Sequence, residues 1–123
     1  MEKFIIDYAV DYFKTSTSKK KQIKNQELDQ ILQIQLGITP LSEGGIRGLI
    51  HEIRKNVSIE NEEGSKGWIC GSSDGYYLSY NPLDILTHLM QYEGKINKMK
   101  TIHQKGMELL RTKIYYSQQE INF

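Results

Sequence analysis

Cationic side chains at helical spacing are the residues of this sequence with the clearest chemical use. Arg47, His51 and Arg54 recur every three or four positions, so a helix would bring them to one side. Guanidinium and imidazole groups can address the base edges and phosphates of a DNA duplex, and small residues between them let the backbone approach it. The candidates on this side are Gly44, Arg47, Gly48, His51, Arg54 and Lys55. A solvated helix face with ordinary surface charges is the alternative interpretation.

Further candidates for contact with DNA lie outside this helix; they are Lys21, Lys24, Lys66, Ser72 and Ser73. The first two belong to segment 14–24, which holds five lysines and no acid and could clamp phosphates. The other three lie at or near an expected hairpin tip, where small hydroxyl groups suit phosphate contacts. Segment 42–67 has four cations against five acids, so the expected DNA-reading helix does not lie in the most basic part of the chain.

No pattern in the sequence predicts an enzyme. The histidines, His51, His88 and His103, lie in different segments, and the motifs of zinc proteases, phosphate-binding loops and serine hydrolases are missing. Cys70 is the only cysteine, which excludes an intramolecular disulfide and a cysteine-rich zinc site. Its apolar neighbours favour a small buried side chain over a reactive thiol. We therefore expect no catalytic residue, no metal site and no cofactor.

Length and composition set the class of protein. The chain has 123 residues, of which 38% are hydrophobic and 25% charged, so we expect one soluble globular domain rather than a disordered or collagen-like chain. Sixteen basic and fifteen acidic residues give a net charge of +1, which argues against a strongly basic coat protein. An acidic start and the lack of a long apolar run predict neither a signal peptide nor a membrane span, and hence a cytoplasmic protein.

Apolar residues at helical spacing predict three helices in the first half of the chain, over 3–14, 26–36 and 43–55. Gly37 is a natural C-terminal stop for the second, and Ser42 is a good N-cap for the third. The apolar stripe of the third helix consists of Ile46, Leu49, Ile50 and Ile53. Two helices joined by a short turn, the second with a polar outer side, form a helix-turn-helix pattern.

A hairpin is expected next. The β-prone runs 68–70 and 76–80 flank a turn that contains Asp74-Gly75, which is a strong hairpin signal. Segment 60–67 before it is polar and contains glycine, so we expect a flexible loop there.

A long helix is expected from Pro82 to about residue 117, because Asn81-Pro82 favours a helix start and only isolated glycines interrupt the residues after it. Its length of roughly 50 Å is too great to pack entirely on so small a core. Residues at alternating steps of four and three form an imperfect heptad stripe, which predicts a dimer interface. The interface candidates are Ile85, Leu89, Tyr92, Ile96, Met99, His103 and Leu110.

Segments 46–54 and 68–78, which read IRGLIHEIR and WICGSSDGYYL, resemble small winged helix-turn-helix proteins encoded by phages and prophages of low-GC bacteria. The resemblance covers roughly residues 23–100. It implies a recognition helix, a wing hairpin and a long C-terminal helix, and it implies DNA binding.

The expected fold is therefore mainly α with a small β-hairpin. A winged helix-turn-helix domain would cover 1–81, a long helix for dimerisation or packing would cover 82–117, and a disordered tail would cover 118–123. We expect a homodimer that binds double-stranded DNA as a transcription regulator or replication accessory factor, in the host cell cytoplasm if it is phage-encoded. The alternative hypothesis is a phage-encoded module that docks on a host protein through the acidic loop 60–63 and modulates it. We expect no membrane partner.

Overall fold

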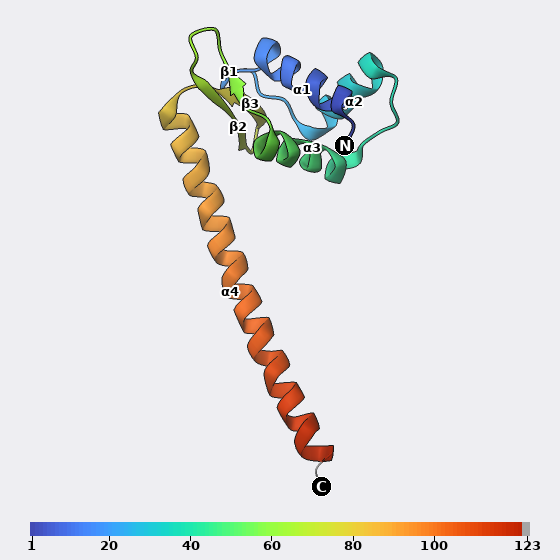
Figure 1. Ribbon diagram of the computed structural model, residues 1–123, viewed down its shortest axis with the longest axis vertical. Helices are drawn as coiled ribbons and strands as arrows, with labels where there is room; N and C mark the ends of the chain where they lie inside the picture. The colour runs from blue at the N-terminus through green and yellow to red at the C-terminus, as the bar shows by residue number, and fades with distance from the viewer. Residues whose placement is uncertain (122–123) are drawn as a thin grey trace. The chain divides into compact units, whose positions relative to one another are not determined.

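The computed structural model describes the backbone of residues 1–121 and the side chains of residues 1–114. Its elements, in chain order, are α1 (Lys3–Ser16), α2 (Asn25–Leu36), α3 (Ser42–Asn56), β1 (Ile59–Glu60), β2 (Lys66–Ser72), β3 (Gly75–Ser79) and α4 (Pro82–Ile121). The chain divides into an N-terminal unit, Met1–His88, and a C-terminal unit that begins at Leu89. The prediction of a mainly helical fold with a small sheet and a long C-terminal helix is confirmed (Figure 1).

Helical periodicity builds the core of the N-terminal unit, in which α1, α2 and α3 gather beside the sheet (Figure 1). Each helix buries only the residues that recur every three or four positions, and the strands and the segment before α2 add single side chains. The main buried residues are Ile5, Ala9, Phe13, Ile23, Leu28, Leu32, Ile46, Leu49, Ile50, Ile53, Ile59, Ile69 and Leu78. A fully buried leucine or isoleucine contributes about 1.5–3 kcal/mol, so this cluster fixes which side of α3 faces outward.

The turn between α2 and α3 is held by local hydrogen bonds. Gly37 adopts a left-handed backbone conformation, with φ of 63°, and its N–H donates to the Gln33 carbonyl oxygen, as expected for a helix stop. The Leu41 N–H donates to Asp29 Oδ1 at 2.9 Å, which ties the turn back to α2. Ser42 Oγ accepts from the Gly45 N–H at 3.4 Å, the bond that a capping hydroxyl makes.

The sheet is antiparallel with strand order β1-β2-β3. In the β2–β3 hairpin, Trp68 pairs with Ser79 and Ser72 with Gly75. Ile23, in the segment before α2, adds a bridge to the outer edge of β3 by exchanging two backbone hydrogen bonds with Tyr76, at 2.9 and 2.8 Å. Gly75 is required beside this bridge, because a Cβ there would lie 2.4 Å from the Ile23 carbonyl oxygen.

The expectation of a flexible loop over 60–67 is wrong. Glu60 pairs with Lys66, and Ile59 with Gly67, so this segment forms a second hairpin. Asn61 closes it, because its Oδ1 accepts hydrogen bonds from the N–H groups of Glu63 and Ser65, at 3.0 and 2.9 Å. The turn is thus closed by an asparagine side chain rather than by one of the two-residue turn sequences that mark most hairpins.

The long helix begins at Pro82, as predicted, and its C-terminal end differs from the prediction. The division between the two units lies inside this helix, since its first turns, through His88, belong to the N-terminal unit. The helix also continues past 117 to Ile121, since neither glycine nor proline occurs after Gly106 to stop it. Residues 122–123 of the expected tail lie outside the described residues.

Candidate nucleic-acid interface

The outer face of α3, which we define as Gly44, Arg47, Gly48, His51 and Lys55, is exposed along its length. Arg47 forms an ion pair with Glu43 at 2.9 Å, one helical turn earlier, and its side chain stays 58% exposed. At both glycines, nothing beyond the adjacent residues and the backbone of α3 itself lies within 4 Å of the position that a Cβ would take, so these positions are open to a ligand. Surface ion pairs of this kind contribute little, so Arg47 can exchange Glu43 for another acceptor.

Arg54 does not belong to this face, contrary to the position expected from the sequence. Its Nε and Nη2 atoms donate hydrogen bonds of 2.9 and 2.8 Å to the Ile69 carbonyl oxygen. Its guanidinium lies 5.9 Å from the ring centroids of both Trp68 and Tyr76. Helical spacing places Arg54 on the same side of α3 as Arg47 and His51. However, β2 packs over the last turns of α3 and covers Arg54, and helical spacing alone gives no information on where a strand packs.

His88 completes a polar cluster around Arg54 that sequence reasoning did not find. Trp68 Nε1 donates to His88 Nδ1 at 3.1 Å, and Arg54 Nη2 lies 3.4 Å from His88 Nε2. Because an indole N–H can only donate, Nδ1 accepts and the ring proton is on Nε2, so the approach of Arg54 Nη2 to Nε2 is a contact between two donors rather than a hydrogen bond. The cluster joins α3, β2 and the start of α4, so Arg54 positions the hairpin relative to the outer face of α3.

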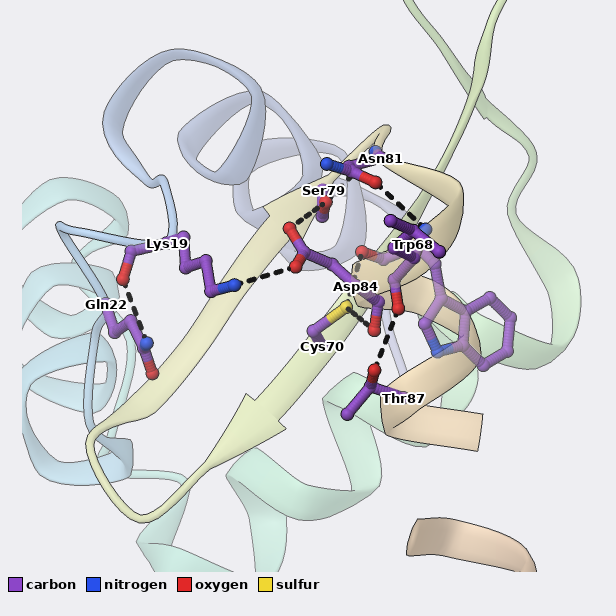
Figure 2. A network of polar contacts seen from close by, with 9 residues as sticks. Lys19, Gln22, Trp68, Cys70, Ser79, Asn81, Asp84 and Thr87 are labelled. Carbon is purple, nitrogen blue, oxygen red and sulfur yellow. Dashed lines mark hydrogen bonds and ion pairs between the residues drawn. The ribbon is translucent and has the colours of Figure 1, made fainter. Parts of the chain in front are cut away.

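A second polar network ties the lysine-rich segment to the start of α4 (Figure 2). Lys19 Nζ lies 2.9 Å from Asp84 Oδ1, and Ser79 Oγ donates to Asp84 Oδ2 at 3.2 Å. The hydrogen bond from Lys19 holds the pKa of Asp84 below its usual value, and the same bond raises the pKa of Lys19. Lys19 therefore has a structural partner although it is exposed, as Lys21 and Lys24 also are.

The hairpin tip is linked to the same segment. Ser72 Oγ donates to Gln22 Oε1 at 2.6 Å and accepts from the Asp74 N–H at 3.1 Å. Gln22 Nε2 in turn donates to the Lys19 carbonyl oxygen at 3.0 Å (Figure 2). The expected role of Ser72 as a phosphate ligand thus competes with a bond it already makes, while Ser73 is exposed at the turn.

Lys55 and Lys66 come together although eleven positions separate them in the sequence. Both line an open, shallow pocket between the end of α3 and the β1–β2 hairpin, with Trp68 at its edge. Lys66 Nζ lies 4.0 Å from Glu60 Oε1, a weak exposed pair. The sheet thus places one further cation, Lys66, at the same pocket as Lys55.

Other chemistry finds no support in the described part of the chain. Cys70 is buried, and burial raises the pKa of its thiol, so it lacks the thiolate character of a reactive cysteine. No three metal-ligating side chains come together in residues 1–114. Among the described helices, α4 included, none combines the length and apolar character that crossing a bilayer requires.

The predicted interface residues of α4 are exposed, apart from Ile85, which is half-buried. Side chains as large as Ile96 and Met99 expose 38% and 68% of their surface.

Comparisons with protein-family models, with curated proteins and with solved structures found no match for this chain.

Proposed function

We propose that the N-terminal unit is a winged-helix domain that binds double-stranded DNA, with α3 as its recognition helix and the β2–β3 hairpin as its wing. The observation that carries this proposal is the outer face of α3. Arg47, His51 and Lys55 are exposed on the side opposite the buried stripe, and the open glycines Gly44 and Gly48 lie on the same side. Such a face can enter a major groove, because the backbone of the helix can come close to the duplex.

The order of elements supports this assignment. The helix-turn-helix pair α2–α3 lies in the chain between Ile23 and the β2–β3 hairpin, and Ile23 pairs with β3. The wing therefore connects to the segment just before α2 as well as to α3 through Arg54. This double attachment holds the wing and the recognition helix in one rigid arrangement, as a DNA-binding site requires.

Different roles follow for the exposed residues. Arg47 and His51 face outward from the middle of α3 and would address base edges, for which an arginine forked to guanine contributes about 1–3 kcal/mol of discrimination. Lys21, Lys24, Lys55 and Lys66 would contact phosphates and contribute affinity without sequence preference. Arg54 would act indirectly, as the positioning residue of the wing.

A homodimer formed through α4 is part of the proposal. One small helix with few cations offers a modest interface to DNA, and linking two copies gains avidity of about 10²–10⁴. The exposed apolar residues of α4 supply a surface for the pairing. The biological role would be that of a transcription regulator or a replication accessory factor of phage type.

Selection of bound sequences from a random duplex library tests the base-reading role. The full chain should enrich a defined motif, and the Arg47→Met variant should lose preference at one or two positions of it while it keeps general affinity. Lys20→Gln, a change at an exposed lysine outside the proposed contacts, is the matched control. Recovery of random sequence by the unchanged protein would overturn the assignment of α3.

A protein-binding module is a second candidate, and the β1–β2 hairpin favours it. Asn61 fixes the turn, so the exposed carboxylates of Glu62 and Glu63 are presented at an ordered tip rather than on a flexible loop. An acidic tip of this kind can engage a basic groove on a host protein. Capture of a bacterial protein that survives nuclease treatment, and is lost when Glu60, Glu62 and Glu63 are changed to lysine, would favour this function over DNA binding.

A further inference from the structure

The exposed seam of α4 has a symmetry that indicates how two copies pair. Its members are Tyr92, Ile96, Met99, His103, Met107, Leu110 and Ile114. The steps between them are four, three, four, four, three and four, which read the same in both directions from His103. At 100° per residue all of them fall within an arc of about 80°, so they form one continuous stripe. A strict heptad continued past His103 would include Gly106 and Lys113. The stripe instead includes their apolar neighbours Met107 and Ile114.

We propose that two copies of this chain pair through α4 in antiparallel orientation, with His103 at the centre of the interface. Tyr92 then faces Ile114 of the second copy, Ile96 faces Leu110, and Met99 faces Met107. Every seam residue thereby meets an apolar partner except His103, which meets its own equivalent. The inference rests on the dimer of the proposed function and does not depend on DNA binding.

The surface of the helix has the shape that such pairing needs. Ile96, Met99, Lys100 and His103, together with Gln104, surround a shallow depression on α4. Residues at i, i+3, i+4 and i+7 form the hole that receives one side chain of a facing helix. In the antiparallel arrangement that side chain is Met107 of the second copy, and its own exposed fraction of 37% leaves it free to insert.

Flanking charges select the antiparallel orientation. When the helices run in opposite directions, Glu93 of each copy lies beside Arg111 of the other, which gives two attractive pairs. Lys95 and Lys113 also come near each other, so one repulsive contact offsets each attractive one. In a parallel pair, Lys95 instead faces Lys100 of the partner, and Glu93 and Arg111 are too far apart to compensate. The antiparallel dimer is thus the less repulsive of the two, and it also sets the helix dipoles in opposition.

The two orientations differ in the distance between the points where the N-terminal units join the paired helices. Fifteen residues separate His88, the end of the N-terminal unit, from His103, and they span about 22 Å of helix. The attachment points of the two N-terminal units therefore lie roughly 45 Å apart in the antiparallel pair. A parallel pair would bring the same two points together.

Disulfide trapping of the full chain tests the orientation. A His103→Cys variant should cross-link under mild oxidation, and a mixture of Met99→Cys and Met107→Cys chains should form the mixed 99–107 disulfide. Met99→Cys alone should not cross-link, because the two sulfur atoms would be offset by about 12 Å along the helices. Peptide mapping by mass spectrometry identifies each bond, so the buried Cys70 stays in place as an internal control.

Each outcome decides the proposal. The mixed 99–107 bond together with a two-chain mass by light scattering supports it. A 99–99 bond would establish a parallel pair, a four-chain mass would establish a larger bundle, and a monomeric mass without the 103–103 bond would remove the interface; each of these overturns the proposal. Loss of DNA binding with the 99–107 bond intact would instead contradict the proposed function alone.

Discussion

Arg54 and Ile69 lie fifteen positions apart in the chain, and the Arg54 guanidinium donates two hydrogen bonds to the Ile69 carbonyl oxygen. This contact joins the last turn of α3 to the middle of β2. Arg54, one of the cations that helical position favours for DNA contact, is therefore a structural residue, and the proposed DNA-reading face of α3 does not include it.

Replacing Arg54 by methionine should lower the free energy of unfolding by about 1.5–3 kcal/mol, because the carbonyl oxygen of the buried Ile69 loses two charge-assisted bonds. Urea denaturation measures the change. The matched control is Arg47→Met on the same helix, which should stay within about 0.5 kcal/mol of the unchanged protein. Equal effects of the two substitutions would show that Arg54 is an ordinary surface residue.

The Lys19–Asp84 pair predicts a specific dependence of stability on pH. The pKa of Asp84 is lowered in the folded protein, so its contribution is complete above the unfolded aspartate pKa of about 3.9 and is lost as pH falls through the folded value. The Asp84→Asn variant should be less stable at pH 7 and should approach the unchanged protein below about pH 3.5. Thermal unfolding at several pH values measures this. Lys19→Gln, which removes the other partner of the ion pair, should behave in the same way, and Lys20→Gln is its matched control. A gap that stays constant down to pH 2.5 would exclude the ion pair as its cause.

Gly48→Ala separates stability from DNA binding. Open space surrounds this helical position among the described atoms, so alanine should raise the free energy of unfolding by about 0.5–1 kcal/mol. The added methyl group would stand between the backbone of α3 and the duplex, so affinity for DNA should fall. Gly94→Ala in α4 offers the same helical gain without this effect. Unchanged affinity in Gly48→Ala would show that the backbone does not approach DNA there.

Cys70 should react with a thiol reagent at least about 100-fold more slowly in the folded protein than in urea, because it is buried and its thiol pKa is raised. Labelling kinetics at pH 8 measure the ratio. Rapid labelling of folded protein would instead indicate that the sheet opens readily around β2.

Much of the fold could be predicted because it depends on local patterns. The stripes of α2 and α3 follow from the spacing of their apolar residues, and the β2–β3 hairpin follows from Asp74-Gly75. The β1–β2 hairpin was missed because Asn61 closes it with a side chain, inside a segment whose polar composition is typical of loops.

The candidate site was only partly predictable, for a different reason. The exposure of Arg47 and His51 follows from helical geometry, whereas the covering of Arg54 depends on where β2 packs. The bonds Trp68–His88 and Lys19–Asp84 join residues 20 and 65 positions apart, and no local pattern marks such pairs. Asp84 could be recognised only as an acid in the first turn of a helix.

Affinity for a duplex of about 30 base pairs, measured by fluorescence anisotropy as salt rises from 50 to 200 mM, tests DNA binding most directly. Four lysines at phosphates predict a slope of log affinity against log salt of about −3 to −4 for each bound copy. Lys55→Gln should reduce that slope by about one, and Lys19→Gln should leave it unchanged. No binding at micromolar protein in 50 mM salt, or binding that salt does not weaken, would contradict the assignment of the N-terminal unit as a DNA-binding domain.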